Sequence, residues 1–219
     1  NLKYIQLESN DFIRYQPTFD FITKQLPNLE TLSLIGSYPN NQQDTTTILK
    51  ALLLGACAFQ QTLKVLDLQQ MGITETQLIH SILYGIAPLY TNLTELHLMY
   101  NNVGSLQPLN NIIQQQQQKQ QMTGDGRRPS SQPQPPVNNS TTLRTINLSQ
   151  NPIADQIQQK FNKKDETILP KEEKDAILYL LNNFTGISNL LLFENNKANN
   201  DYLWRRRVHP PEERHHRHR

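Results

Sequence analysis

One apolar pattern recurs six times along the chain and constrains its fold more than any other feature. Each copy has apolar residues at its first, fourth and sixth positions, and its ninth position is often Asn. The fourth and sixth positions alternate with neighbours in the way that a strand with one buried face requires, so each copy predicts a short strand. Such repetition is typical of stacked-repeat proteins. The copies begin at Leu2, Leu29, Leu63, Leu93, Leu143 and Ile187.

The segments between these copies predict helices. Successive copies begin 27, 34, 30, 50 and 44 residues apart, which leaves room for a helix in each interval. Apolar residues recur there at helical spacing. They are Phe19, Ile22 and Leu26; Ile48, Leu49, Leu52, Leu53 and Ala56; Leu78, Ile82 and Ile86; and Ile177, Leu178, Leu180, Leu181 and Phe184. The ninth-position Asn is expected to hydrogen-bond backbone groups inside the coil, and Met71 departs from this pattern.

Together these features resemble the leucine-rich repeat family. The short spacings resemble its long-repeat subclass, typified by ribonuclease inhibitor and by the GTPase-activating protein of Ran. The resemblance implies an α/β fold, namely a right-handed leucine-rich-repeat solenoid of about six repeats. Its concave face would be a parallel β-sheet and its convex face would carry the helices.

The repeats predict a solenoid domain over residues 1–204 with two insertions. Residues 114–142 are of low complexity, contain a polyglutamine run and are expected to be disordered, although a partner site in the run stays open. Residues 161–174 form a charged insertion. Residues 205–219 hold six Arg and two Glu and predict a basic, disordered tail. Since the first copy begins at Leu2, we also interpret the chain as a fragment.

Composition excludes several classes of function. The chain has 219 residues, with 21 Lys and Arg against 19 Asp and Glu, and this near-neutral balance argues against a dedicated nucleic-acid binder. The longest apolar run covers residues 51–59, well short of the ~20 residues that a membrane span needs. Cys57 is the single cysteine, which excludes an internal disulfide framework.

We expect no cofactor, no metal site and no small-molecule substrate. We also expect a cytoplasmic location, and the basic tail leaves nuclear import open.

The resemblance implies that the third, fifth, seventh and eighth positions face the concave side. Met, Tyr and Phe in such positions are typical anchors for a protein partner. The candidate partner-binding residues are Asp67, Gln69, Glu95, His97, Met99, Tyr100, Leu191 and Phe193. Leu191 and Phe193 lie near the end of the repeats, where capping of the last repeat explains them equally well.

Ser33, Asp67 and His97 share the fifth position and invite comparison with a catalytic triad. Strands are ~4.8 Å apart, so Ser33 and His97 would be two strands, or ~9–10 Å, apart, with Asp67 between them. We therefore expect no catalytic residue. The sequence predicts a non-enzymatic protein–protein interaction scaffold that binds another protein, of unknown identity, on its concave face.

Two alternatives stay open. One is a small-GTPase regulator of the Ran-activator type, although no arginine falls in the exposed positions to carry over as a catalytic residue. The other is a substrate-receptor module of a ubiquitin ligase, which needs an adaptor-binding segment such as an F-box.

Overall fold

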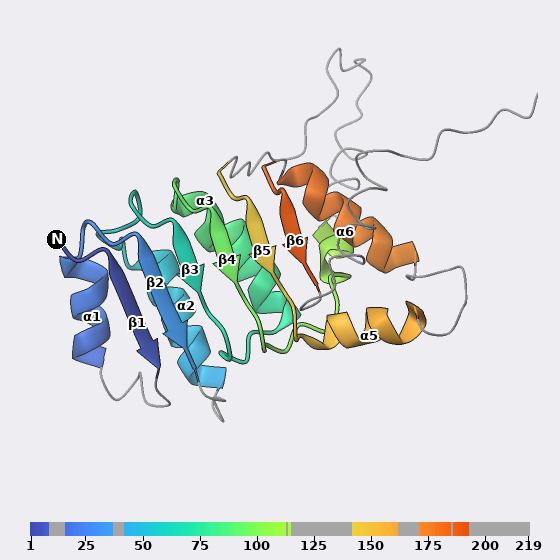
Figure 1. Cartoon of the computed structure of the whole chain (residues 1–219), viewed down its shortest axis with the longest axis horizontal. Coiled ribbons are helices and arrows are strands. Elements are labelled where there is room, and N and C mark those ends of the chain that lie inside the picture. The colour runs from blue at the N-terminus through green and yellow to red at the C-terminus, as the bar shows by residue number, and fades with distance from the viewer. Residues whose placement is uncertain are drawn as a thin grey trace, which may run out of the picture.

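Six strands form one parallel sheet, and their order in space is their order along the chain (Figure 1). The computed structural model describes residues 1–8, 16–36, 42–112, 114, 142–161, 171–184 and 186–192. The strands are β1 (Tyr4–Glu8), β2 (Thr31–Ile35), β3 (Val65–Asp67), β4 (Glu95–His97), β5 (Thr145–Asn147) and β6 (Asn189–Leu191). The predictions for residues 115–141, 162–170, Phe193 and the tail 205–219 lie outside the described residues.

Helices alternate with the strands, and Figure 1 shows them behind the sheet and at its two ends. They are α1 (Gln16–Gln25), α2 (Gln42–Leu54), the π-helix η2 (Gln77–Ile86), α3 (Ala87–Leu89), α5 (Pro152–Phe161) and α6 (Lys171–Asn183). Residues 108–112 form a further helical turn. Strand and helix thus follow each other as predicted, and the molecule has an α/β repeat fold.

The strand register follows the repeat motif without a slip. The fourth-position residue of each copy pairs with that of the next, as Leu66 does with Leu96 and Leu96 with Ile146. The first, fourth and sixth positions fill the core, as predicted: the residues at these positions from Leu29 to Leu148 are all fully buried. In the first copy, by contrast, Ile5 and Leu7 are only half-buried. Among the described residues, β1 has a neighbouring strand on one side, β2, whereas β2 to β5 each have two.

Asn101 and Asn151 make the hydrogen bonds that are expected of the ninth position. Asn101 Oδ1 accepts hydrogen bonds from the backbone N–H groups of Met71 (2.9 Å) and Ile73 (3.0 Å) in the preceding repeat. Asn101 Nδ2 donates to the carbonyl oxygens of Leu68 (2.9 Å) and Leu98 (3.0 Å). The prediction that this side chain ties backbone groups inside the coil is confirmed. Asn101 thus accepts the hydrogen bonds of the third repeat, because the ninth residue of that repeat, Met71, has no side-chain amide to do so.

The helices bury most of the residues that the spacing predicted, but Leu178 is 39% exposed, and Ala56 is exposed and lies beyond the end of α2. Leu78, Ile82 and Ile86 of η2 are fully buried, although the helix is wider than the α-helix implied by the spacing, since Ala87 N–H donates to Ile82 O. The helix α6 begins at Lys171, inside the range interpreted as the charged insertion. This start places Glu173 in the interior, where it is 6% exposed.

Candidate functional site

The open face is the side of the sheet that turns away from the helices, and the fifth-position residues form a row across it. The register places Asp67 beside Ser33 on one side and beside His97 on the other. His97 in turn pairs with Asn147, and Asn147 pairs with Leu191. The row therefore brings together Asp67, His97 and Leu191, the fifth-position candidates that sequence reasoning selected, and Glu95 lies two residues before His97 on β4.

Hydrogen bonds hold the Asp67 carboxylate in place. Ser33 Oγ donates to Asp67 Oδ2 at 3.0 Å, and Gln69 Nε2 donates to the same oxygen at 2.9 Å. The backbone N–H of Gln69 donates to Asp67 Oδ1 at 3.2 Å. Each of these donors is uncharged, so the bonds orient the Asp67 side chain without placing a positive charge beside it. The sequence placed Ser33 next to Asp67 but gave no signal for this bond.

His97 has a different partner. Its Nε2 lies 2.9 Å from Glu95 Oε2, and the two side chains are 25% and 44% exposed. Ser33 thus bonds to Asp67 while His97 bonds to Glu95. The register places Asp67 between Ser33 and His97, so the serine and the histidine lie on strands that are not neighbours.

Met99 and Tyr100 follow β4 after the buried Leu98 and add apolar surface near His97. Met99 is half-buried, whereas Tyr100 is 46% exposed. Tyr100 has a φ of 56°, a left-handed conformation that is uncommon for a bulky residue. Gln70 and Gln150, at the same eighth position, have φ angles of 54° and 59°. The turn at this position therefore recurs, and in the fourth copy it presents an aromatic ring.

Leu191 lies farther along the same row and is half-buried. Its neighbour Phe193 is outside the described residues. The structure therefore brings Asp67, Gln69, Glu95, His97, Met99 and Tyr100 together on two adjacent repeats, with Leu191 two strands away from His97.

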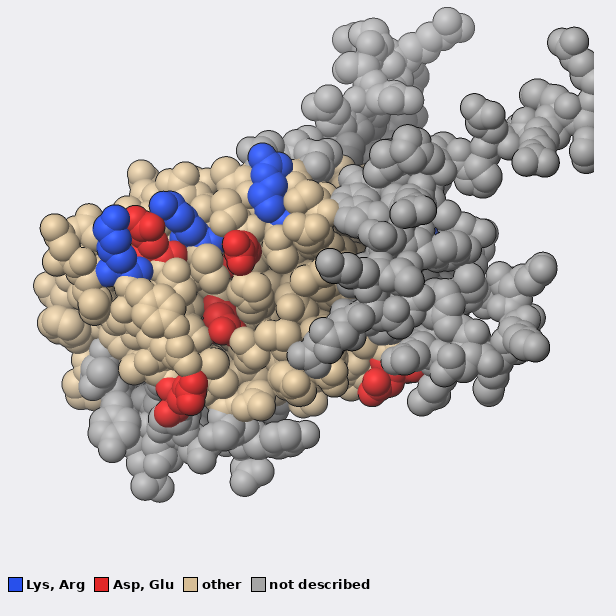
Figure 2. Space-filling model, in the orientation of Figure 1, with Lys and Arg blue, Asp and Glu red and all other residues tan. Residues whose placement is uncertain are grey.

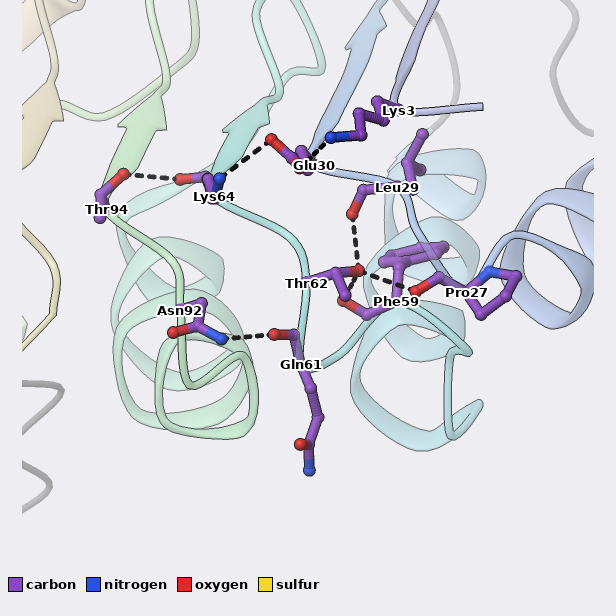
Figure 3. A network of polar contacts seen from close by, with 10 residues as sticks. All are labelled: Lys3, Pro27, Leu29, Glu30, Phe59, Gln61, Thr62, Lys64, Asn92 and Thr94. Carbon is purple, nitrogen blue, oxygen red and sulfur yellow. Dashed lines mark hydrogen bonds and ion pairs between the residues drawn. The ribbon is translucent and has the colours of Figure 1, made fainter. Parts of the chain in front are cut away.

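A second polar row runs along the edge of the sheet where the strands begin (Figure 3). Glu30 lies between two lysines, with its carboxylate oxygens 3.1 Å from Lys3 Nζ and 3.0 Å from Lys64 Nζ. These hydrogen bonds, from Lys64 first and Lys3 second, lower the pKa of the Glu30 carboxyl. Lys3, Glu30 and Lys64 occupy the second position of the first three copies, and sequence reasoning missed the bridging role of Glu30.

The basic side chains of the viewed face lie along one edge of the sheet. Figure 2 shows the Lys and Arg side chains gathered along one edge, with isolated Asp and Glu side chains across the rest of the described surface. The third, fifth, seventh and eighth positions of the described repeats include Glu8, Asp67 and Glu95 but no Lys or Arg. The centre of the open face is thus acidic and partly apolar.

Comparison with known proteins agrees with this architecture. Residues 91–106 and 139–157 match the family described as Leucine Rich repeat. The two matched segments contain the fourth and fifth copies of the motif with β4 and β5. With the repeated strand pattern and the parallel sheet, they support assignment to the leucine-rich repeat family.

A solved structure of "Leiomodin-1 Actin-Binding Site 2 (ABS2)" is similar over 83% of this chain and 80% of that chain. The sequence identity is 12% and the TM-score is 0.49, a likeness too low to bear on function. No curated protein matches the chain. None of the described helices is both long and apolar enough to cross a membrane.

Proposed function

We propose that this chain is a non-enzymatic scaffold that binds another protein on the open face of its sheet. The supporting observation is the cluster of Asp67, Glu95, His97, Met99 and Tyr100 on two adjacent repeats. Strands on both sides hold it, and hydrogen bonds orient its polar side chains. A surface that is ordered before binding loses little conformational entropy when a partner arrives.

The partner contact has two parts in this proposal. Tyr100, with nearly half of its side chain exposed, supplies an aromatic anchor, and the thioether of Met99 adapts to the opposing surface. Asp67 and Glu95 orient the partner through their charge. Leu191 and Phe193 extend the face toward the last repeat.

Finer features belong to the same proposal. The solenoid is right-handed with the open face concave, its repeats are of the ribonuclease-inhibitor-like subclass, and the protein works in the cytoplasm. The repeat spacings and the strand–helix alternation support the subclass.

Site-specific photo-crosslinking tests the proposal. A photo-reactive phenylalanine analogue at Tyr100 is expected to capture a partner in cells, and the same analogue at Leu54 is not. Leu54 is a matched control because it is 76% exposed and lies at the end of α2, away from the open face. Capture at Leu54 with none at Tyr100 would move the binding site to the helical side.

A separate assay addresses the small-GTPase alternative. The purified chain is mixed with a panel of GTP-loaded small GTPases, and phosphate release is followed. The scaffold proposal expects no acceleration, whereas faster hydrolysis would favour a regulator of the Ran-activator type.

A further inference from the structure

Two carboxylates at the centre of the open face differ from the one at the edge of the sheet in their partners. The hydrogen bonds to Asp67 come from uncharged groups, and Glu95 contacts His97, which is charged only when protonated. Glu30 at the edge, by contrast, contacts two lysines. Since the open-face positions of the described repeats include no Lys or Arg, the centre of this face carries uncompensated negative charge.

The opposite charge is concentrated in the basic tail, residues 205–219. This tail holds six Arg and two Glu, a net charge of +4, whereas residues 1–204 hold 15 Lys and Arg against 17 Asp and Glu. A basic segment that is tethered to an acidic face meets it at a high effective concentration, because the encounter takes place within one chain.

The connection to the tail is long enough to reach the acidic centre. The twelve residues 193–204 separate Leu192, directly after β6, from the tail, and they span up to about 40 Å when extended. The strands β6 and β3 are three strands, or about 14 Å, apart. Because the sheet is parallel, the chain also leaves β6 at the edge where Met99 and Tyr100 follow β4.

We propose that the Arg-rich tail of this chain docks on the open face of its own sheet and pairs there with Asp67 and Glu95. A guanidinium forms paired hydrogen bonds with a carboxylate and also stacks on aromatic rings. The exposed ring of Tyr100 offers such a stacking surface on the same face.

The spacing of the charges fits this pairing. Asp67 aligns with His97, two residues beyond Glu95 on the neighbouring strand, so the Cα atoms of the two acidic residues lie roughly 8 Å apart. In an extended segment, Arg205 and Arg207 would direct their side chains to one side at a separation of roughly 7 Å. Two arginines of the tail can therefore meet the two carboxylates at once.

The docked tail also regulates the open face. The proposed function assigns this face to a protein partner, and the regulatory part of the inference rests on that proposal. Tail and partner would compete for the same carboxylates, so the tail lowers the apparent affinity for the partner until it is displaced. The docking itself needs no partner and is tested without one.

Paramagnetic relaxation enhancement in the full chain tests the docking. A nitroxide attached through Val208→Cys, inside the tail, is expected to broaden the amide signals of His97 and Met99 at low salt. The amide of Leu54, at the end of α2, is the reference and should keep its intensity. The native Cys57 is buried and should stay unlabelled. In about 1 M salt, where the screening length falls to about 3 Å, the broadening should disappear.

Neutral variants test which charges carry the contact. The double variant Asp67→Asn with Glu95→Gln removes both charges and keeps the side-chain shapes, and it is expected to lose the broadening. The matched control, Asp155→Asn with Asp175→Asn, removes two exposed charges from α5 and α6 and should retain it.

A tail variant keeps the test independent of any change in the sheet. Replacing Arg205, Arg206 and Arg207 with Gln leaves every described residue unaltered and should abolish the broadening as well. Broadening that survives in either neutral variant, or no broadening in the parent chain, overturns the docking. Broadening between tagged chains and untagged, isotope-labelled chains in a mixture would assign the contact to a second copy and also overturn it. Since no partner is present, none of these outcomes depends on capture at Tyr100.

Discussion

The Asn101 side chain satisfies backbone groups of two neighbouring repeats and is itself buried. Replacing it with alanine leaves the N–H groups of Met71 and Ile73 without an acceptor in the interior. Since a buried unsatisfied donor costs about 1–3 kcal/mol, we expect Asn101→Ala to lower the free energy of unfolding by about 2–3 kcal/mol. Urea denaturation followed by circular dichroism measures this loss.

Asn102 provides the control for that prediction. Its side chain is exposed, and its contact with Ile73 O is made by the backbone N–H, which a substitution keeps. Asn102→Ala should therefore change stability by no more than about 0.5 kcal/mol. Similar losses in the two variants would show that Asn101 does not carry the interior hydrogen bonds.

Glu30 makes a pH-dependent contribution. Its pKa is lowered in the folded chain by the bonds to Lys64 and Lys3, so the ionised carboxylate favours the fold. This contribution is complete above the ordinary pKa of the group and disappears as the pH falls through the lowered value. Glu30→Gln should therefore be less stable than the parent chain at neutral pH and equally stable in strong acid.

Thermal melts across a pH series measure the Glu30 effect. Because the pair is exposed, added salt should shrink the difference at neutral pH. If the stability difference between Glu30→Gln and the parent chain depends on neither pH nor salt, its cause is packing rather than charge.

The turn after β2 approaches the backbone of the next repeat at Gly36. A Cβ atom there would lie 2.6 Å from Gln70 O and 2.9 Å from Met71 Sδ. Backbone cannot move aside without disturbing the register of β2 and β3, so Gly36→Ala is expected to cost about 1–3 kcal/mol in stability.

Gly104→Ala is the matched control in the same denaturation assay. Its Cβ would also meet an atom at 2.9 Å, but that atom is Glu75 Oε1, at the end of a flexible side chain. The loss should be clearly smaller than for Gly36→Ala, limited to the bond from Gly104 N–H to Glu75 Oε1. The reverse order would argue against close repeat packing at Gly36.

Glu173 of α6 hydrogen-bonds to the fourth repeat. The Glu173 carboxylate accepts hydrogen bonds from Ser105 Oγ and from Leu106 N–H, both at 2.6 Å, while itself buried. Glu173→Ala leaves both donors unpaired and should cost about 1–3 kcal/mol. Hydrogen exchange should rise at the amide of Leu106, and Lys174→Ala, at an exposed neighbour, should leave that amide protected. If exchange at the Leu106 amide is unchanged in Glu173→Ala, the Glu173 hydrogen bonds do not hold α6 against the fourth repeat.

The repeat made most of the molecule predictable. A period of two at Leu66 and Leu68 marks a strand with one buried face, and identical spacing in every copy sets the register, so the sheet and its row of Asp67 and His97 followed from the sequence. Glu173 could not be predicted, because it lies among charged residues and its partners are 67 and 68 residues away.

The hydrogen-bond partners of the open-face side chains also could not be predicted from the sequence. The register put Asp67 next to both Ser33 and His97, but spacing alone does not decide which of them it bonds. The left-handed turn at Tyr100 also lacks the glycine that ordinarily marks such a conformation. The existence and order of the elements are thus encoded locally, whereas the details of the open face depend on contacts across repeats.

The central proposal divides the whole molecule into a buried layer that gives stability and an open face that binds. Isothermal titration of the partner captured through Tyr100, against the parent chain and the Met99→Ala and Tyr100→Ala variants, tests it most directly. Each substitution is expected to weaken binding by about 1–3 kcal/mol and to leave the melting temperature almost unchanged. Leu96→Ala, by contrast, should cost about 2–5 kcal/mol of stability, because Leu96 is fully buried. Unchanged affinity in both open-face variants would contradict binding at the centre of the open face.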